Sequence, residues 1–296
     1  MGGSARKPDW FKVKYVKNKR TEQVSGLMKE YNLHSVCQSA HCPNCPECWS
    51  QGTASFMIMG EFCTRGCRFC AVKTMAKPPP PDPEEPEHLA EALSTLNLRY
   101  VVITSVARDD LKDGGAGHFA DCVKSIRKRN PELLIETLIP DFRADESAME
   151  MLTDSKPDVI SHNIETIERL TPRVRDLRAN YAQSLEVLKQ AHEISDGRII
   201  TKSGMMVGLG ETKDEVKEAM MDLITAGVGI LTIGQYLSPS PRHIPLDEYV
   251  PPETFDFYEK MGYALGFTYV ASGPLVRSSY RAAEPFIKRI IKSRIH

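Results

Sequence analysis

The chain has 296 residues, of which 41% are hydrophobic and 26% are charged, and its formal net charge is −1. These proportions are ordinary for a globular protein with a sizeable core. A charge so near zero gives no global field that would favour nucleic acid or a membrane as a partner, and no apolar run approaches the roughly 18 residues that span a bilayer. The first residues show no apolar signal-peptide core, so the eight cysteines indicate metal ligation in the cytoplasm rather than a disulfide framework.

After an expected helix at 21–33, a first group of cysteines lies within 12 positions, namely Cys37, Cys42, Cys45 and Cys48. Two prolines in this segment predict a wrapped loop rather than a helix. The spacing leaves two triads open, because either Cys37 or Cys45 can join Cys42 and Cys48, the latter with ferredoxin-like spacing. His41 could bind a metal, although a lone histidine among cysteines is more often exposed or hydrogen-bonded to a ligand.

A second group of cysteines, Cys63, Cys67 and Cys70, follows an apolar run at 54–62 that reads as a buried strand. Three thiolates so close together can hold one metal centre, but zinc and ordinary iron–sulfur sites want a fourth protein ligand, and no cysteine follows within reach. Three ligands to a four-iron cluster leave one iron open for a substrate. A zinc knuckle, or incidental buried cysteines, is the alternative.

From residue 54 onwards, strand and helix patterns alternate. The expected strands are 54–62, 100–107, 133–142, 159–166, 200–212 and 230–240, and the expected helices are 88–98, 118–130, 145–155, 184–194, 215–227 and 251–267. Six such units predict an α/β fold, a partial (β/α)6 TIM-type barrel. We expect three parts, an N-terminal cysteine-rich extension (1–53), the barrel (54–272) and a C-terminal tail over the site (273–296). Cys122, on the apolar face of its helix, is expected in the core.

Polar side chains follow the expected strand at 159–166. Asn163 and Glu165 lie near its end, where an amide and a carboxylate suit ribose hydroxyls or an ammonium group. Arg175 could pair with a carboxylate or lie at the surface. His162 reads as a structural group. Arg108–Gly115, after the strand at 100–107, either meets a ligand or forms a turn that uses Asp and Gly for its geometry.

The pattern Cys63-x3-Cys67-x2-Cys70, with Phe69 before the last cysteine, resembles the signature of radical S-adenosylmethionine (SAM) enzymes. Four further motifs resemble those of lipoyl synthases: Cys37-x4-Cys42-x5-Cys48, HNIET at 162–166, GLGE at 208–211 and RSSY at 277–280. Cys45 departs from the family, which usually has an aliphatic residue there. The resemblance covers roughly residues 7–285.

This resemblance implies two [4Fe-4S] clusters and SAM as cofactors. One cluster, held by Cys63, Cys67 and Cys70, would bind SAM through its open iron, with Asn163, Glu165 and Arg175 as SAM contacts. The auxiliary cluster would be held by Cys37, Cys42, Cys48 and Ser279, with Ser278 as the alternative serine and Cys45 as a bystander or alternative ligand. An alkoxide ligand suits a cluster that is taken apart, because it can be protonated and released.

The implied reaction inserts two sulfur atoms at carbons six and eight of an octanoyl chain amide-linked to a lysine, with the auxiliary cluster as the sulfur donor. The implied partners are an octanoylated carrier, either a lipoyl domain or the glycine-cleavage H protein, and an electron donor such as ferredoxin or flavodoxin. Basic segments at 12–20 and 288–294 could steer an acidic carrier. The rival hypotheses are another radical enzyme that inserts sulfur, such as a biotin-synthase-like activity, and a non-enzymatic iron–sulfur carrier or zinc module.

Overall fold

A computed structural model describes residues 7–11, 19–39, 42, 44–50, 55–96 and 98–278. The basic segments, His41, Ser279 and the rest of the RSSY motif after Ser278 lie wholly or partly outside these ranges. The strands are β1 (His34–Ser35), β2 (Ser55–Ile58), β3 (Phe62–Cys63), β4 (Lys73–Thr74), β5 (Tyr100–Ser105), β6 (Leu134–Leu138), β7 (Val159–Ser161), β8 (Ile200–Val207), β9 (Ile230–Gln235) and β10 (Tyr269–Gly273).

The α-helices are α1 (Lys19–Glu30), α2 (Val36–Ser39), α3 (Cys45–Ser50), α4 (Glu85–Leu96), α5 (Ala116–Arg129), α6 (Glu146–Asp154), α7 (Thr171–Val174), α8 (Tyr181–Ile194), α9 (Lys213–Thr225) and α10 (Pro252–Leu265). Short 3-10 turns span Asp9–Phe11, Phe142–Ala144 and Glu168–Leu170. Within the described residues, no helix has both the length and the apolar character needed to cross a membrane.

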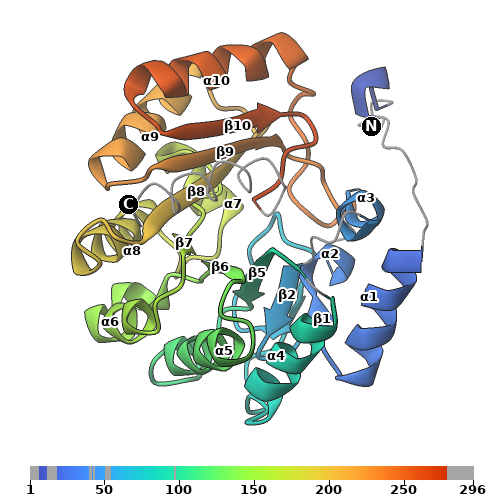
Figure 1. Ribbon diagram of the computed structural model, residues 1–296. Coiled ribbons are helices and arrows are strands. Elements are labelled where there is room, and N and C mark those ends of the chain that lie inside the picture. Colours follow the sequence, from blue (N-terminus) through green and yellow to red (C-terminus); the bar gives the residue numbers. More distant parts are fainter. Residues whose placement is uncertain are drawn as a thin grey trace.

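One curved sheet carries the fold, in the order β1-β2-β5-β6-β7-β8-β9-β10. Every neighbouring pair in it is parallel except β1 and β2, which run antiparallel. Helices α4, α5, α6, α8, α9 and α10 lie outside the sheet, as Figure 1 shows. This arrangement confirms the predicted partial TIM-type barrel, since parallel strands joined by helices curve with the helices outside.

Several features differ from the sequence prediction, which also missed the short strands β1, β3 and β4. β10 adds a parallel strand beside β9 that the pattern did not indicate, because it is short and directly follows a helix that ends at a left-handed glycine, Gly266. The first cysteine segment contains the short helices α2 and α3, so the prediction of a loop without helix was wrong there. Pro46 falls in the first turn of α3, where a helix needs no N–H from it.

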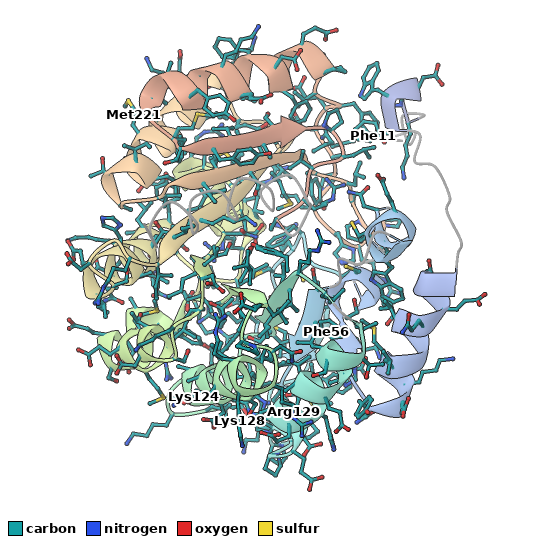
Figure 2. All side chains as sticks on the ribbon, viewed as in Figure 1. Phe11, Phe56, Lys124, Lys128, Arg129 and Met221 are labelled. Carbon is teal, nitrogen blue, oxygen red and sulfur yellow. The ribbon has the colours of Figure 1, made fainter. Side chains whose placement is uncertain are left out.

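The core lies between the sheet and its outer helices. On α5, the inward side chains Phe119, Cys122 and Ile126 are fully buried, which confirms that Cys122 is a core residue. Figure 2 shows Lys124 and Lys128 on the opposite, outer side of the same helix. The separation follows the helical period of the sequence and fixes which face of α5 meets the strands.

Candidate functional site

The second cysteine group lies on a loop at the carboxyl end of β2. Short parallel strands β3 and β4 close the base of this loop, with Cys63 paired to Thr74. Backbone N–H groups donate to two of the sulfurs, that of Asp176 to Cys67 Sγ at 3.3 Å and that of Arg65 to Cys63 Sγ at 3.4 Å. Such donors stabilise thiolates and tune the potential of an iron–sulfur cluster.

Burial raises the pKa of all three thiols in this loop, that of Cys70 to about 12. The protonated thiol is thus the stable form until a metal takes the proton's place, and metal binding must release protons. Among the described residues, no three His, Cys, Asp or Glu side chains converge in a way that would hold a single metal ion. The sulfur-directed N–H donors and the missing fourth cysteine fit a cluster with one open iron.

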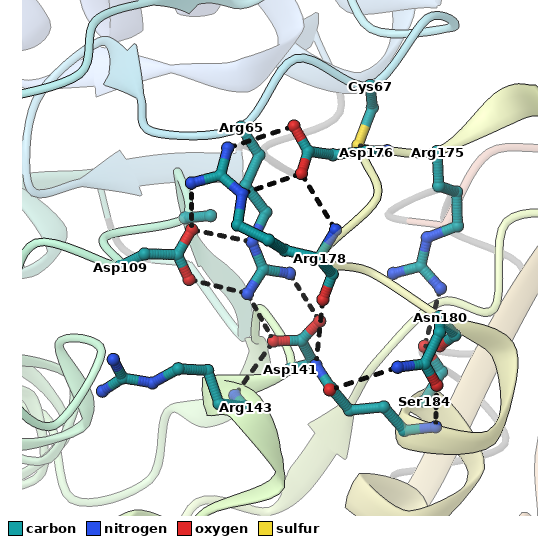
Figure 3. A network of polar contacts seen from close by, with 12 residues as sticks. Arg65, Cys67, Asp109, Asp141, Arg143, Arg175, Asp176, Arg178, Asn180 and Ser184 are labelled. Atoms are coloured by element: carbon teal, nitrogen blue, oxygen red, sulfur yellow. Dashed lines mark hydrogen bonds and ion pairs between the residues drawn. The ribbon is translucent and has the colours of Figure 1, made fainter. Parts of the chain in front are cut away.

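A buried arginine, Arg65, anchors the loop between its first two cysteines. Its guanidinium donates to both carboxylate oxygens of Asp109, at 2.9 and 2.7 Å, and to both of Asp141, at 2.5 and 2.8 Å (Figure 3). These aspartates follow β5 and β6, so one side chain joins the cluster loop to two strands of the barrel. The guanidinium, together with hydrogen bonds, holds the pKa of both carboxyls below the usual range although burial opposes this.

Asp176 and Arg178 hold the same loop from the segment after α7. Asp176 accepts from the backbone N–H of Gly66 at 2.8 Å, and Arg178 donates to Asp176 at 2.9 Å and to the carbonyl of Thr64 at 2.7 Å. The sequence analysis did not identify Arg65, Asp141, Asp176 or Arg178. A charged residue placed between two cluster cysteines was the available signal for the first of them.

The predicted SAM contacts lie beyond β7. Asn163 Nδ2 donates to Glu165 Oε1 at 3.1 Å, and loss of solvent raises the pKa of Glu165 although Arg175 and that amide oppose the shift. Glu165 has a φ of 66°, in the left-handed region that costs a non-glycine residue energy, and it bridges to Met205 of β8. Arg175 donates to Ser184 Oγ at 2.6 Å. The structure therefore brings Asn163 and Glu165 together, with the charge of Arg175 near them.

Two buried polar atoms at this site have no hydrogen-bond partner within the described part of the chain, Asn163 Oδ1 and Arg175 Nε. Buried polar atoms are nearly always paired, so an orphaned acceptor and donor beside the cluster loop suit a polar ligand with groups of both kinds. SAM offers an ammonium group, a carboxylate and ribose hydroxyls. His162, by contrast, is fully engaged by the Ile139 carbonyl and Ser184, as expected of a structural group.

The loop after β5 is a turn with an ion pair of its own. Arg108 donates to both oxygens of Asp110, each at 2.8 Å, and the glycine pair adopts positive φ, 63° at Gly114 and 95° at Gly115. Asp109 turns to the cluster loop, and Arg108 also reaches it, donating to the carbonyl of Met59 at 3.3 Å. These contacts account for Arg108 and Asp110 as parts of a turn.

The first cysteine group is folded into a compact unit. The backbone N–H of Cys42 donates to the carbonyl of Cys37 at 3.0 Å, and that of Cys45 to the carbonyl of Cys42 at 3.2 Å. A hydrogen bond with the Cys45 thiol lowers the pKa of Cys37, while the same contact raises that of Cys45. Cys45 therefore lies against a predicted ligand. The negative charges that Cys42 and Cys48 carry as thiolates also raise the pKa of Cys45.

The C-terminal tail meets this unit. Asn44 Nδ2 donates to the carbonyl of Leu275 at 2.6 Å. Burial raises the pKa of the Cys42 thiol, and the positive charge of Arg277 partly offsets that rise. The structure thus brings the start of the RSSY motif beside the first cysteine group. Ser278 accepts from Asn163 at 2.7 Å, so this alternative serine is engaged on the barrel side. The neighbouring Ser279 lies outside the described residues.

Comparison with known proteins identifies the class. Residues 57–223 match the Radical SAM superfamily. Among solved structures, methylornithine synthase (PylB) shares the fold with a TM-score of 0.56 at 12% identity, covering 94% of this chain and 89% of that one. Streptococcus suis SuiB bound to S-adenosylmethionine gives a TM-score of 0.57 at 11% identity, covering 78% and 54%. The chain is a radical SAM protein.

Curated relatives narrow the family. Lipoyl synthase of Anaeromyxobacter sp. (strain Fw109-5) is 57% identical over 291 residues, which cover 98% of each chain. The chloroplastic lipoyl synthase of Arabidopsis thaliana is 52% identical, covering 98% of this chain and 74% of that one. The chain belongs to the lipoyl synthase family, and the resemblance found in its motifs is confirmed.

Proposed function

We propose that this chain uses the two cysteine groups for two clusters with separate tasks in lipoyl synthesis. As a member of the family it is a radical SAM sulfurtransferase with [4Fe-4S] clusters and SAM as cofactors, and it acts on octanoylated carrier proteins. The observation that carries the proposal is the contact between Asn44 of the first cysteine group and Leu275, in a segment whose Ser278 accepts from Asn163, one of the proposed SAM contacts.

Cys63, Cys67 and Cys70 would hold the SAM cluster, and Cys37, Cys42, Cys48 and Ser279 the auxiliary cluster. Bound there, these groups supply a radical able to remove hydrogen from unactivated carbon, and the sulfur that replaces it. The protein's part is placement. Asn163 and Glu165 orient SAM through its hydroxyl and ammonium groups, and Arg175 offers Nε to its carboxylate.

We assign the three parts of the chain three tasks: residues 1–53 carry the auxiliary site, 54–272 form the SAM barrel, and 273–296 cover the site. The carrier is a lipoyl domain of a 2-oxoacid dehydrogenase or the glycine-cleavage H protein, and ferredoxin or flavodoxin delivers electrons. The cytoplasm suits the chain, since ligand thiols require a reducing compartment.

Mass spectrometry of an octanoyl-lysyl peptide tests the proposal. The peptide is incubated anaerobically with reconstituted protein, SAM and dithionite. We expect the peptide to gain two sulfurs as a dithiol, which loses two hydrogens only on oxidation to the disulfide, with methionine and 5′-deoxyadenosine as the other products. Production of 5′-deoxyadenosine with an unchanged peptide would contradict the substrate, and the absence of both products from protein with its full iron content would contradict the chemistry.

A further inference from the structure

The segment after β10, residues 274–278, is held at three points, and we call it the tail turn. Its own turn closes through the N–H of Val276, which donates to the carbonyl of Gly273 at 3.1 Å. It lies between the first cysteine group on one side and the interior of the barrel on the other. Each side contributes hydrogen bonds to it from buried residues.

On the cysteine side, Asn44 holds the turn through the carbonyl of Leu275 at 2.6 Å. Asn44 is only 1% exposed and sits between Cys42 and Cys45. A buried amide of this kind is placed by its hydrogen bonds, because leaving its donors unmade costs free energy. The contact therefore fixes how far the tail turn stands from the cysteines.

On the barrel side, Lys202 of β8 holds the turn through the carbonyl of Ser278 at 2.6 Å. The same ammonium donates to both oxygens of Glu136 on β6, at 2.8 and 2.9 Å. A lysine has three donors, so all three are used. Tyr100 of β5 also hydrogen-bonds Glu136. Strands β5, β6 and β8 thus support one lysine, two of whose N–H groups bind Glu136 while the third binds the tail turn.

This ion pair is fully enclosed, with side chains 2% and 0% exposed. Removing two charges from water is costly, and buried pairs of this kind add little net stability compared with apolar residues of the same size. Their better-supported role is to specify one arrangement. Here the pair orients the ammonium of Lys202 towards the carbonyl of Ser278.

Close packing on β9 provides the third point. A Cβ added to Gly234 would lie 2.2 Å from the carbonyl oxygen of Val276. No side chain fits there, so the tail turn lies directly on the backbone of β9. Asn163 adds a further hydrogen bond to Ser278 Oγ, at 2.7 Å, from beside Glu165.

We infer that Lys202, with Glu136 as its support, and Asn44 are positioning residues that fix the tail turn between the barrel and the first cysteine group. The turn ends one residue before Ser279. Insofar as Ser279 ligates the auxiliary cluster, which rests on the proposed function, these residues place that ligand. The hold on the tail turn itself does not depend on what Ser279 binds.

Native-state proteolysis of the holoenzyme under anaerobic conditions tests the hold. Trypsin cleaves after Arg277 only when the turn opens, and in this regime the rate follows the population of the open state. The variant Lys202→Met with Glu136→Gln avoids an unpaired buried carboxylate. We expect cleavage at Arg277, followed by intact mass, to accelerate about tenfold, the effect of losing a hydrogen bond from a charged donor.

Lys124→Met, the same substitution on the exposed face of α5, should leave the cleavage rate unchanged. Asn44→Asp removes the donor to Leu275 on the other side and should also accelerate cleavage, which keeps the inference testable if the double variant does not fold. Unchanged cleavage at Arg277 in a folded double variant, or in folded Asn44→Asp, would overturn the inference.

The spectrum of the auxiliary cluster separates this inference from the proposed function. It is recorded by Mössbauer spectroscopy in chains whose Cys63, Cys67 and Cys70 are alanine. We expect Ser279→Ala to change the spectrum and the double variant to shift it in the same direction. If Ser279→Ala changes nothing while cleavage still accelerates in the double variant, the serine assignment falls and the positioning role stands.

Discussion

The two cysteine groups are held by different kinds of interaction. Buried ion pairs attach the loop of Cys63, Cys67 and Cys70 to the barrel, chiefly through Arg65. The first group has no such ion pair among its described contacts; it is held by backbone turns, by a bond from the Cys37 N–H to Ser35, by packing of Cys48 and Trp49 into the core, and by the bond from Asn44 to the tail. On the proposed function, the loop that would keep its cluster is tied to two strands by buried charges, whereas the group that would lose its cluster in each turnover is tied to the C-terminal tail by one neutral hydrogen bond.

Removing one cysteine from each group tests this comparison most severely. We expect Cys67→Ala and Cys48→Ala each to lower bound iron from about eight to about four per chain, since each abolishes one four-iron cluster. Only Cys67→Ala should also abolish SAM cleavage. Iron analysis and chromatography of 5′-deoxyadenosine measure the two effects, and Cys122→Ala in the core should leave the iron unchanged. Loss of SAM cleavage in Cys48→Ala would contradict separate tasks.

The anchor of the cluster loop can be broken at Arg65. Its replacement by leucine leaves the buried carboxylate of Asp141 without its ion-pair partner and Asp109 with only Arg178 and Thr64, so we expect the free energy of unfolding to fall by about 3–5 kcal/mol. Urea unfolding followed by circular dichroism measures the change. Arg65→Lys keeps the charge but cannot bridge two carboxylates in the same way. Its free energy of unfolding should lie between those of the wild type and Arg65→Leu.

Arg99→Leu provides the matched control, because Arg99 is exposed and directly precedes β5, whereas Asp109 follows the other end of that strand. We expect a change within about 0.5 kcal/mol, as for most surface substitutions. An Arg65→Leu variant as stable as this control would show that the buried network does not anchor the loop.

We expect the stability of the barrel to depend on pH through His162, which directly precedes Asn163. Burial lowers its pKa to about 4. The unfolded chain binds a proton near pH 6.5 while the folded chain stays neutral, so stability is lost as the pH falls from about 6.5 towards 4. Between pH 7.5 and 5.5 we expect a loss of about 1 kcal/mol from this group.

His162→Gln should remove this part of the pH dependence, and His192→Gln, at an exposed position of α8, should not. Urea unfolding at the two pH values gives the comparison. If the free energy of unfolding falls equally between the two pH values in wild type and in His162→Gln, the buried histidine does not contribute to the pH dependence.

The smallest effect is expected at Cys45. The family-based assignment makes Cys37, Cys42 and Cys48 the ligands, so Cys45→Ile should retain the auxiliary cluster and most of the sulfur insertion. Iron content and peptide mass report on both. Loss of about four iron atoms per chain, one whole cluster, would show instead that Cys45 is a ligand.

The sequence predicted much of the fold because strand and helix periods repeat clearly from residue 54 onwards. The short strand β10 escaped, and so did α2 and α3, where proline in a first helical turn looked like a break. Cysteine spacing singled out both candidate metal groups. Arg65, Lys202 and Asn44 were not found, since their roles depend on partners 44 to 231 positions away that only the fold brings close.

The most direct test of separate tasks is a single-turnover comparison of wild type and Cys48→Ala on the octanoyl-lysyl peptide, with SAM in excess and both products quantified. We predict 5′-deoxyadenosine from both proteins and sulfur in the peptide from wild type alone. Sulfur insertion by Cys48→Ala, with its auxiliary cluster shown by Mössbauer spectroscopy to be missing, would contradict the account.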